Sequence, residues 1–220
     1  MFLLALLACA PVGNGKAALA FDGPPDCATI DNPGDAPTSF TLEMWLRGDP
    51  DAGPQLRPLA IWSGVFELAE REDGVVSFAV GDDGAAATYA FSLFDGVVHH
   101  VAGTYDGADG SVRLFVDGKL AGANEAFPGE ADDRVQVGCA KAATEAWYGV
   151  IDEIRLSSAV RYTGDFTRPD SAFKDDNDTM MLFHLDEGEG ESAASASGNA
   201  EMFITDAGWV EFNAFSGSGE

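Results

Sequence analysis

Basic residues are scarce in this sequence. Its 220 residues include 12 Lys and Arg against 37 Asp and Glu, a formal net charge of −25. Because nucleic-acid affinity depends on neutralised phosphates, this charge excludes DNA and RNA as partners, and anionic lipid headgroups would repel the chain. With 46% hydrophobic residues it is not a disordered acidic tail either. The excess acid fits a solvated surface, a salt-rich setting or carboxylate sites for divalent cations.

Long apolar runs are also lacking. The N-terminal run MFLLALLA ends at Cys9 and is too short to span a bilayer, which needs ~20 apolar residues. It is typical of the end of a secretory signal. Residues 6–9, LLAC, resemble a bacterial lipobox, in which the Cys is lipidated, although no Lys or Arg precedes Cys9. We therefore predict a signal remnant and linker over 1–16 and a lipoprotein of the bacterial cell envelope, lipidated at Cys9. Plain secretion and a chance apolar start are the alternatives.

Cysteine is rare, with three in the chain. No CxxC spacing occurs, which argues against a zinc or thioredoxin-like site. Cys27 and Cys139 each lie near a strand-like segment, and an exported chain folds in an oxidising compartment. We predict a disulfide between them, and two separate buried thiols are the alternative.

Helical periodicity is scarce, whereas turn residues are plentiful, with 26 Gly and 10 Pro. Asp117-Gly118 lies between two apolar runs and predicts a two-residue hairpin turn, because that turn needs positive φ at both positions. Short strand-like runs recur along the chain and predict an all-β sandwich or barrel. The expected strands are 40–47, 75–80, 88–94, 97–105, 112–116, 135–138, 150–156 and 180–186.

The segment FTLEMWLR, residues 40–47, alternates as a strand does. Trp45 lies between Glu43 and Arg47 on one face. An aromatic ring between opposite charges can be a sugar-stacking platform, so Trp45 and Glu43 are candidate ligand-binding residues. Cross-strand packing on the sheet surface or under a loop is the alternative. The other face should line the core with Phe40, Leu42, Met44 and Leu46.

Four segments resemble one family when taken in order. They are ALAFDG at 18–23, FTLEMWL at 40–46, HHVAGTYDGADGSVRLFVDGKLAG at 99–122 and GVIDEIRL at 149–156. Together they are similar to laminin-G-like domains of the concanavalin A-like superfamily, which includes pentraxins. The resemblance implies a jelly roll of two antiparallel sheets over 17–212. Residues 182–212 would be closing strands or the start of a further element, and 213–220 a flexible tail.

Asp152 is the leading metal candidate. It shares parity with Ile154 and should therefore point toward the core, where an unpaired carboxylate is costly and a Ca²⁺ ion would be one remedy. The resemblance implies a structural Ca²⁺ between Asp22 and Asp152, with the Gly23 carbonyl as a further ligand. Turn caps or acceptors of backbone N–H groups are the alternative roles. The loop 26–35, which includes Asp31, is a weaker cation or ligand candidate.

Catalytic signatures are lacking. The chain has three histidines and no G-x-S-x-G elbow. Retaining glycosidases need two carboxylates about 5–5.5 Å apart, and Glu70 with Glu72 comes nearest to that pattern, beside a charged Arg71 and a turn. We predict a non-catalytic, extracytoplasmic module that binds a glycan or an extracellular protein. An adhesive spacer of a larger envelope protein is the first alternative, and a glycoside hydrolase or polysaccharide lyase relative the second.

Overall fold

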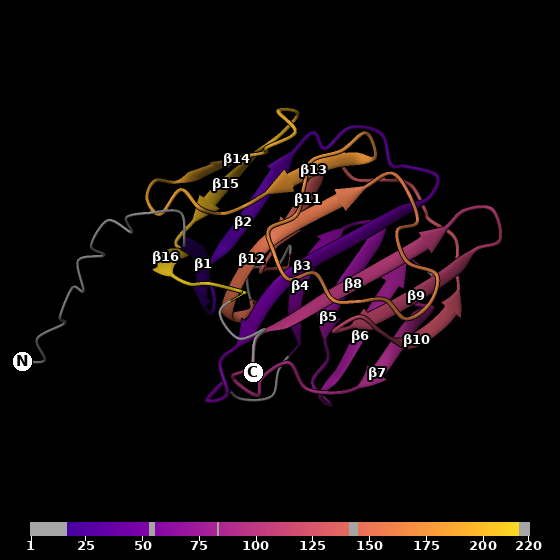
Figure 1. Cartoon of the computed structure of the whole chain (residues 1–220), viewed down its shortest axis with the longest axis horizontal. Coiled ribbons are helices and arrows are strands. Elements are labelled where there is room, and N and C mark those ends of the chain that lie inside the picture. The colour runs from indigo at the N-terminus through magenta and orange to yellow at the C-terminus, as the bar shows by residue number, and fades with distance from the viewer. Residues whose placement is uncertain (1–16, 53–55, 83, 141–144, 216–220) are drawn as a thin grey trace, which may run out of the picture.

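A computed structural model describes residues 17–52, 56–82, 84–140 and 145–215, and it shows sixteen strands in two antiparallel sheets (Figure 1). Sheet A has the order β10-β9-β8-β3-β12-β1-β16, with β13 also paired to β12. Its strands are β1 (Ala17–Asp22), β3 (Phe40–Gly48), β8 (His99–Asp106), β9 (Ser111–Val116), β10 (Lys119–Glu125), β12 (Tyr148–Ser157), β13 (Thr179–Phe183) and β16 (Gly208–Glu211).

Sheet B has the order β14-β15-β2-β11-β4-β5-β6-β7. Its strands are β2 (Cys27–Asp31), β4 (Arg57–Trp62), β5 (Phe66–Glu70), β6 (Val75–Val80), β7 (Ala86–Ala90), β11 (Arg134–Val137), β14 (Ser192–Ala194) and β15 (Glu201–Thr205). The predicted all-β sandwich is confirmed. The segment 182–212 supplies strands to both sheets, whereas 1–16, with Cys9, and 216–220 lie outside the described residues.

The core lies between the sheets, where the alternation of β3 predicts it. Phe40 is fully buried, and its ring lies 5.7 Å from that of Phe66 and 5.3 Å from that of Tyr105. The predicted hairpin turn joins β9 to β10, with φ of 50° at Asp117 and 76° at Gly118. Aromatic side chains from both sheets therefore pack together in the core.

The parity predicted for Asp152 is wrong because β12 contains a bulge. The register with β3 shifts between Asp152 and Arg155, and Glu153 has a φ of 49°. An extra residue in one strand reverses the facing of the residues before it. Asp152 therefore lies opposite Trp45, on the outer face of sheet A and not between the sheets.

A segment of irregular chain crosses the outer face of sheet A (Figure 1). We call residues 158–178 the strap. It is bound to β3 through the Thr41 hydroxyl, which donates to the Ala159 carbonyl at 2.7 Å. Near its middle the Phe166 N–H donates to the carbonyl of Gly118 in the β9–β10 turn. The strap therefore crosses sheet A from β12 to the β9–β10 turn before the chain enters β13.

On one flank the edges of the two sheets lie against each other, because β10 packs on β7. Gly122 of β10 lies directly against the backbone of Thr88, where any larger side chain would collide. The Asn124 amide donates to the Ala86 carbonyl at 2.9 Å. This seam closes that side of the sandwich.

Candidate functional site

The outer face of sheet A is closed around a buried carboxylate. Glu43 is fully buried, and it accepts hydrogen bonds from Nε and Nη2 of Arg155 at 3.0 and 2.8 Å and from the Tyr162 hydroxyl at 2.9 Å. His100 Nε2 lies 3.1 Å from the second carboxylate oxygen. Burial alone would raise the pKa of Glu43, but hydrogen bonding and charge from His100 and Arg155 hold it below its ordinary value.

Trp45 is likewise enclosed. It is 1% exposed, with the Arg168 guanidinium 5.1 Å from its ring centroid and the Phe215 ring 5.1 Å away. The prediction that Trp45 and Glu43 form a sugar-stacking platform is therefore wrong. Both lie under a loop, the alternative considered for them, because the strap and residues 212–215 cover this face.

On the outer face of sheet B, by contrast, several outward side chains of β4 to β7 are partly exposed among the described residues. Its register places Ile61, Glu67, Ala79 and Ala86 side by side across four strands. Because Ser77, Ala79 and Ala86 are small, the surface is hollowed into a cavity of about 500 Å³. We call this cavity the β5–β7 groove. Its lining residues are Leu56, Glu67, Arg71, Ser77, Ala79, Gly81, Asp82, Gly84 and Ala86.

The groove continues past Arg71 into a second hollow of about 340 Å³. Leu56 and Arg71 line both cavities, and Glu72 and Asp73 line the second. Burial raises the pKa of Glu67 above its usual range, and the nearby charge of Glu145 raises it further against the opposing charge of Arg71. The groove therefore presents carboxylates, one guanidinium and a hydroxyl above a floor of small side chains, an arrangement that can hydrogen-bond a polar ligand.

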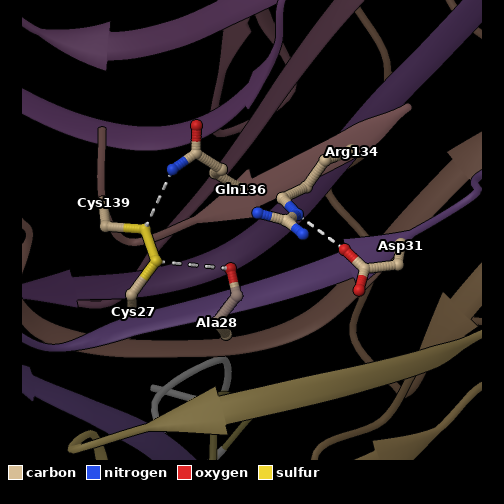
Figure 2. The surroundings of a disulfide bond; sticks show 6 residues. All are labelled: Cys27, Ala28, Asp31, Arg134, Gln136 and Cys139. Atoms are coloured by element: carbon tan, nitrogen blue, oxygen red, sulfur yellow. Dashed lines mark hydrogen bonds and ion pairs between the residues drawn. A yellow bond between two sulfur atoms is a disulfide. The ribbon is translucent and has the colours of Figure 1, made fainter. Parts of the chain in front are cut away.

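Figure 2 shows the disulfide and its neighbours at β2 and β11. Cys27 and Cys139 are bonded, with Cα atoms 5.1 Å apart, so the predicted pairing is confirmed. Asp31, a weaker ligand candidate, lies 2.6 Å from Nε of Arg134 in an ion pair between adjacent strands. Its carboxylate is already engaged there, outside the groove.

The structure does not bring Asp22 and Asp152 together. Asp22 lies opposite Tyr148, four residues before Asp152 on β12, which separates the two aspartates by roughly 13 Å along the strand. The predicted Ca²⁺ pair therefore does not fit this register, and Gly23 follows Asp22 away from Asp152. In the described part of the chain no three His, Cys, Asp or Glu residues gather as a metal site would need.

Each aspartate instead has a backbone role. Asp152 is 5% exposed and accepts the Glu153 N–H at 2.9 Å, as the alternative for it requires. Burial and the charges of Glu153 and Asp186 raise the pKa of Asp152 to about 8. The Asp22 N–H donates to the buried Asp26 carboxylate at 2.8 Å, and burial raises the pKa of Asp26. Ca²⁺ binding itself stays a prediction.

Comparison with known proteins places the chain in a family. Residues 22–164 match the family model of the concanavalin A-like lectin/glucanases superfamily. The chain belongs to this superfamily. No curated protein sequence matches it.

Solved structures share this superfamily fold at low identity. A Bacteroides ovatus protein provisionally described as carbohydrate-binding is similar with a TM-score of 0.69 and 18% identity, over 90% of this chain and 60% of that one. A SAP-like pentraxin of Limulus polyphemus has a TM-score of 0.56 and 12% identity, over 89% of this chain and 98% of that one. The CBM40 of a Ruminococcus gnavus sialidase, bound to α2,6-sialyllactose, has a TM-score of 0.52 and 17% identity, over 67% and 93%.

The superfamily name spans lectins and glucanases, so the acidic and histidine side chains need separate placement. Glu70 is 4% exposed and accepts the Ser92 hydroxyl at 2.8 Å and the Leu93 N–H at 2.7 Å, which occupies its carboxylate structurally. His99 lies between Asp95 and Asp117, and His100 faces Glu43. Within the described ranges, no helix is both long and apolar enough to cross a membrane.

Sequence reasoning missed the groove, although it examined the neighbouring Glu70 and Glu72. Glu67 alternates with Phe66 and Leu68, so its outward facing follows from the pattern of β5. The hollow needs small residues on two further strands, Ser77, Ala79 and Ala86, in one particular register. The available signal was the alternation of the small residues Ser77 and Ala79 in the predicted strand 75–80, whereas Ala86 lies before the predicted strand 88–94.

Proposed function

We propose that this chain is a non-catalytic, exported binding module that holds a glycan in the β5–β7 groove. The observation that carries the proposal is the contrast between the two outer faces. The strap closes one face, whereas the other has a polar hollow of about 500 Å³ over β5, β6 and β7. Hydrogen-bonding side chains on a rigid sheet suit the hydroxyl-rich surface of a sugar.

Two further observations support this proposal. The fold neighbours include a protein described as carbohydrate-binding and a CBM40 bound to sialyllactose. The Cys27–Cys139 disulfide is consistent with an oxidising compartment, which supports export. Because the chain spans 60% of the length of the Bacteroides ovatus protein, any activity of a longer protein is a separate matter.

The test fills the groove and leaves the fold intact. Ala79→Trp places a large ring on the groove floor, and Ala194→Trp makes the same change at an exposed position on β14, at the opposite edge of sheet B. Binding to a glycan array, followed by calorimetry on the best hit, should fall at least about tenfold for Ala79→Trp. Ala194→Trp should bind as the unmodified chain does.

Two results would contradict the proposal. Equal glycan binding by both variants would mean that the binding site lies outside the β5–β7 groove. Absence of binding to any glycan would favour the adhesive-spacer alternative. Circular dichroism and the melting temperature check that each variant is folded. Release of reducing sugar from a bound polysaccharide would contradict the non-catalytic part.

A further inference from the structure

Negative charge surrounds the β5–β7 groove and its continuation. Carboxylates of Glu67, Asp82, Glu72 and Asp73 line the two hollows, and Arg71 is the one basic side chain among their described lining residues. Glu145 adds a further carboxylate near Glu67. The net charge of this surface has the same sign as the −25 of the whole chain.

Glu67 stands out among these carboxylates. It is half-buried on a central strand, and burial raises its pKa. Among the described residues no hydrogen-bond donor reaches its carboxylate, unlike Glu43 with its several donors. A carboxylate that is partly desolvated without a partner gains free energy when a ligand supplies a donor, and most when that donor is charged.

This arrangement selects among glycans. An anionic sugar would meet like charges across the groove, which disfavours its binding. A neutral sugar can donate hydroxyls to Glu67, whereas an ammonium group adds a charge-assisted bond to the same carboxylate. Glu67 lies opposite Ala79, whose small side chain leaves the Glu67 carboxylate at the surface of the groove.

We propose that the groove binds a glycan whose sugars carry protonated primary amino groups, with Glu67 as the residue that receives the ammonium. This inference rests on the proposed glycan-binding function and adds the ligand's charge to it. Arg71 also lines this groove and can contact ring hydroxyls, whereas the buried Ser77 hydroxyl donates to the Ala69 carbonyl.

A basic peptide is the competing occupant, and the topology disfavours it. Peptides that bind sheets add a strand at a free edge or place side chains in apolar pockets. Strands β5 and β6 are each paired on both sides, and the edge strand β7 packs against β10, whose Asn124 amide donates to the Ala86 carbonyl, so the groove strands offer no free edge. Apart from Leu56, the apolar lining residues described for the groove are Ala and Gly, which form no side-chain pocket.

The experiment compares matched oligosaccharides on the full chain by calorimetry at low and at moderate salt. The probes are a glucosamine oligomer, the fully N-acetylated oligomer of the same length and a uronic-acid oligomer. We expect the glucosamine oligomer to bind about tenfold more tightly than the N-acetylated one, and this preference should shrink as salt rises. The uronic-acid oligomer should not bind.

Variants assign the effect to Glu67. Glu67→Gln should lose most of the amino-sugar preference and retain binding of the N-acetylated oligomer. Glu201→Gln removes the same charge from an exposed position on β15, at the far side of sheet B, and should retain the preference. A preference lost equally in both variants would mean that the groove responds only to overall charge, and the assignment to Glu67 would be wrong.

The outcomes separate the two levels of inference. Equal affinity for the amino and N-acetylated oligomers would overturn the amino-sugar proposal and leave glycan binding standing. Binding of no oligosaccharide would overturn both. A lysine-rich peptide of equal charge that binds as tightly as the glucosamine oligomer, and is displaced by it, would show that a basic peptide is the better ligand class.

Discussion

The two outer faces of this sandwich each contain a partly or fully buried carboxylate, but they differ in the hydrogen-bond donors around it. On sheet A, Glu43 is fully buried and receives donors from β12 and the strap. On sheet B, Glu67 is half-buried, and burial raises its pKa, whereas hydrogen bonds and charges from His100 and Arg155 hold the pKa of Glu43 below its ordinary value. This difference shows that burial alone does not decide the role of a carboxylate. A carboxylate surrounded by hydrogen-bond donors stabilises the fold, whereas one without donors is available to a ligand.

Removal of the Glu43 carboxylate, on the outer face of sheet A, should cause the largest decrease in stability. Glu43→Ala leaves Arg155 as a buried charge without its partner, and such a loss typically costs about 3–5 kcal/mol. Urea unfolding measures this change in the free energy of unfolding. Glu189→Ala, at an exposed loop position, is the control and should change it by less than about 0.5 kcal/mol. A similarly small effect of Glu43→Ala would mean that the strap does not depend on Glu43.

Loss of the disulfide in sheet B should cause the next largest decrease in stability. The bond joins residues separated by 112 positions. The free energy of unfolding of the double variant Cys27→Ser with Cys139→Ser should therefore be lower by about 2–5 kcal/mol, because the cross-link no longer restricts the unfolded chain. Urea unfolding of the unmodified chain with and without a thiol reductant provides the independent check. Identical curves under the two conditions would mean that the bond does not form in solution.

Asp152 makes the stability of the protein depend on pH. The pKa of Asp152 is raised, whereas that of Glu43 is lowered, so their contributions to stability change with pH in opposite directions. The folded pKa of Asp152, about 8, lies above the unfolded value of about 3.9, so the native state binds the extra proton. The stability that this proton provides is complete below the unfolded pKa and is lost as pH rises toward 8. Asp152→Asn should therefore unfold like the parent at pH 4 and be more stable at pH 8.5, by at least about 1.4 kcal/mol.

Melting curves in a chelator at the two pH values measure this effect. The same curves with millimolar Ca²⁺ at pH 8.5 test whether a cation takes the place of the proton. Stabilisation by Ca²⁺ that Asp152→Asn abolishes would support a metal site at Asp152. An Asp152→Asn variant less stable than the parent at pH 8.5 would contradict the raised pKa.

The Asp31–Arg134 ion pair should have the smallest effect. Its side chains are 41% and 52% exposed, and water and salt screen such a pair so that it contributes little to stability. Asp31→Asn should lower stability only slightly, and added salt should reduce the difference. Glycan binding should be unchanged, because Asp31 lies outside the β5–β7 groove. Loss of glycan binding in Asp31→Asn would mean that the binding site extends from the β5–β7 groove to β2.

Local pattern sufficed to predict the core strand and the hairpin. Phe40 is in the core because β3 alternates, and Asp117-Gly118 turns because both residues adopt positive φ. Asp152 was misplaced because a bulge at a non-glycine residue, Glu153, reversed the parity, and nothing in the local composition marks that bulge. Local signals describe one strand at a time, so they fail where a register changes within it.

The candidate site was less predictable for a related reason. The covering of Trp45 comes from the strap and from Phe215, which lie more than a hundred residues further along the chain. The groove depends on the register that brings Glu67 beside Ala79 and Ala86. Alternation within a strand shows which residues face outward, but not whether another segment covers them.

The seam between β7 and β10 has a consequence for how copies of this chain behave at high concentration. An exposed sheet edge is a template on which another chain can add a strand and begin to aggregate. Here each of the two edges on that flank faces the other, with Gly122 against Thr88. On the opposite flank the terminal strands are short, three residues in β14 and four in β16. A protein whose described regular structure consists of strands is thereby protected from edge-to-edge polymerisation.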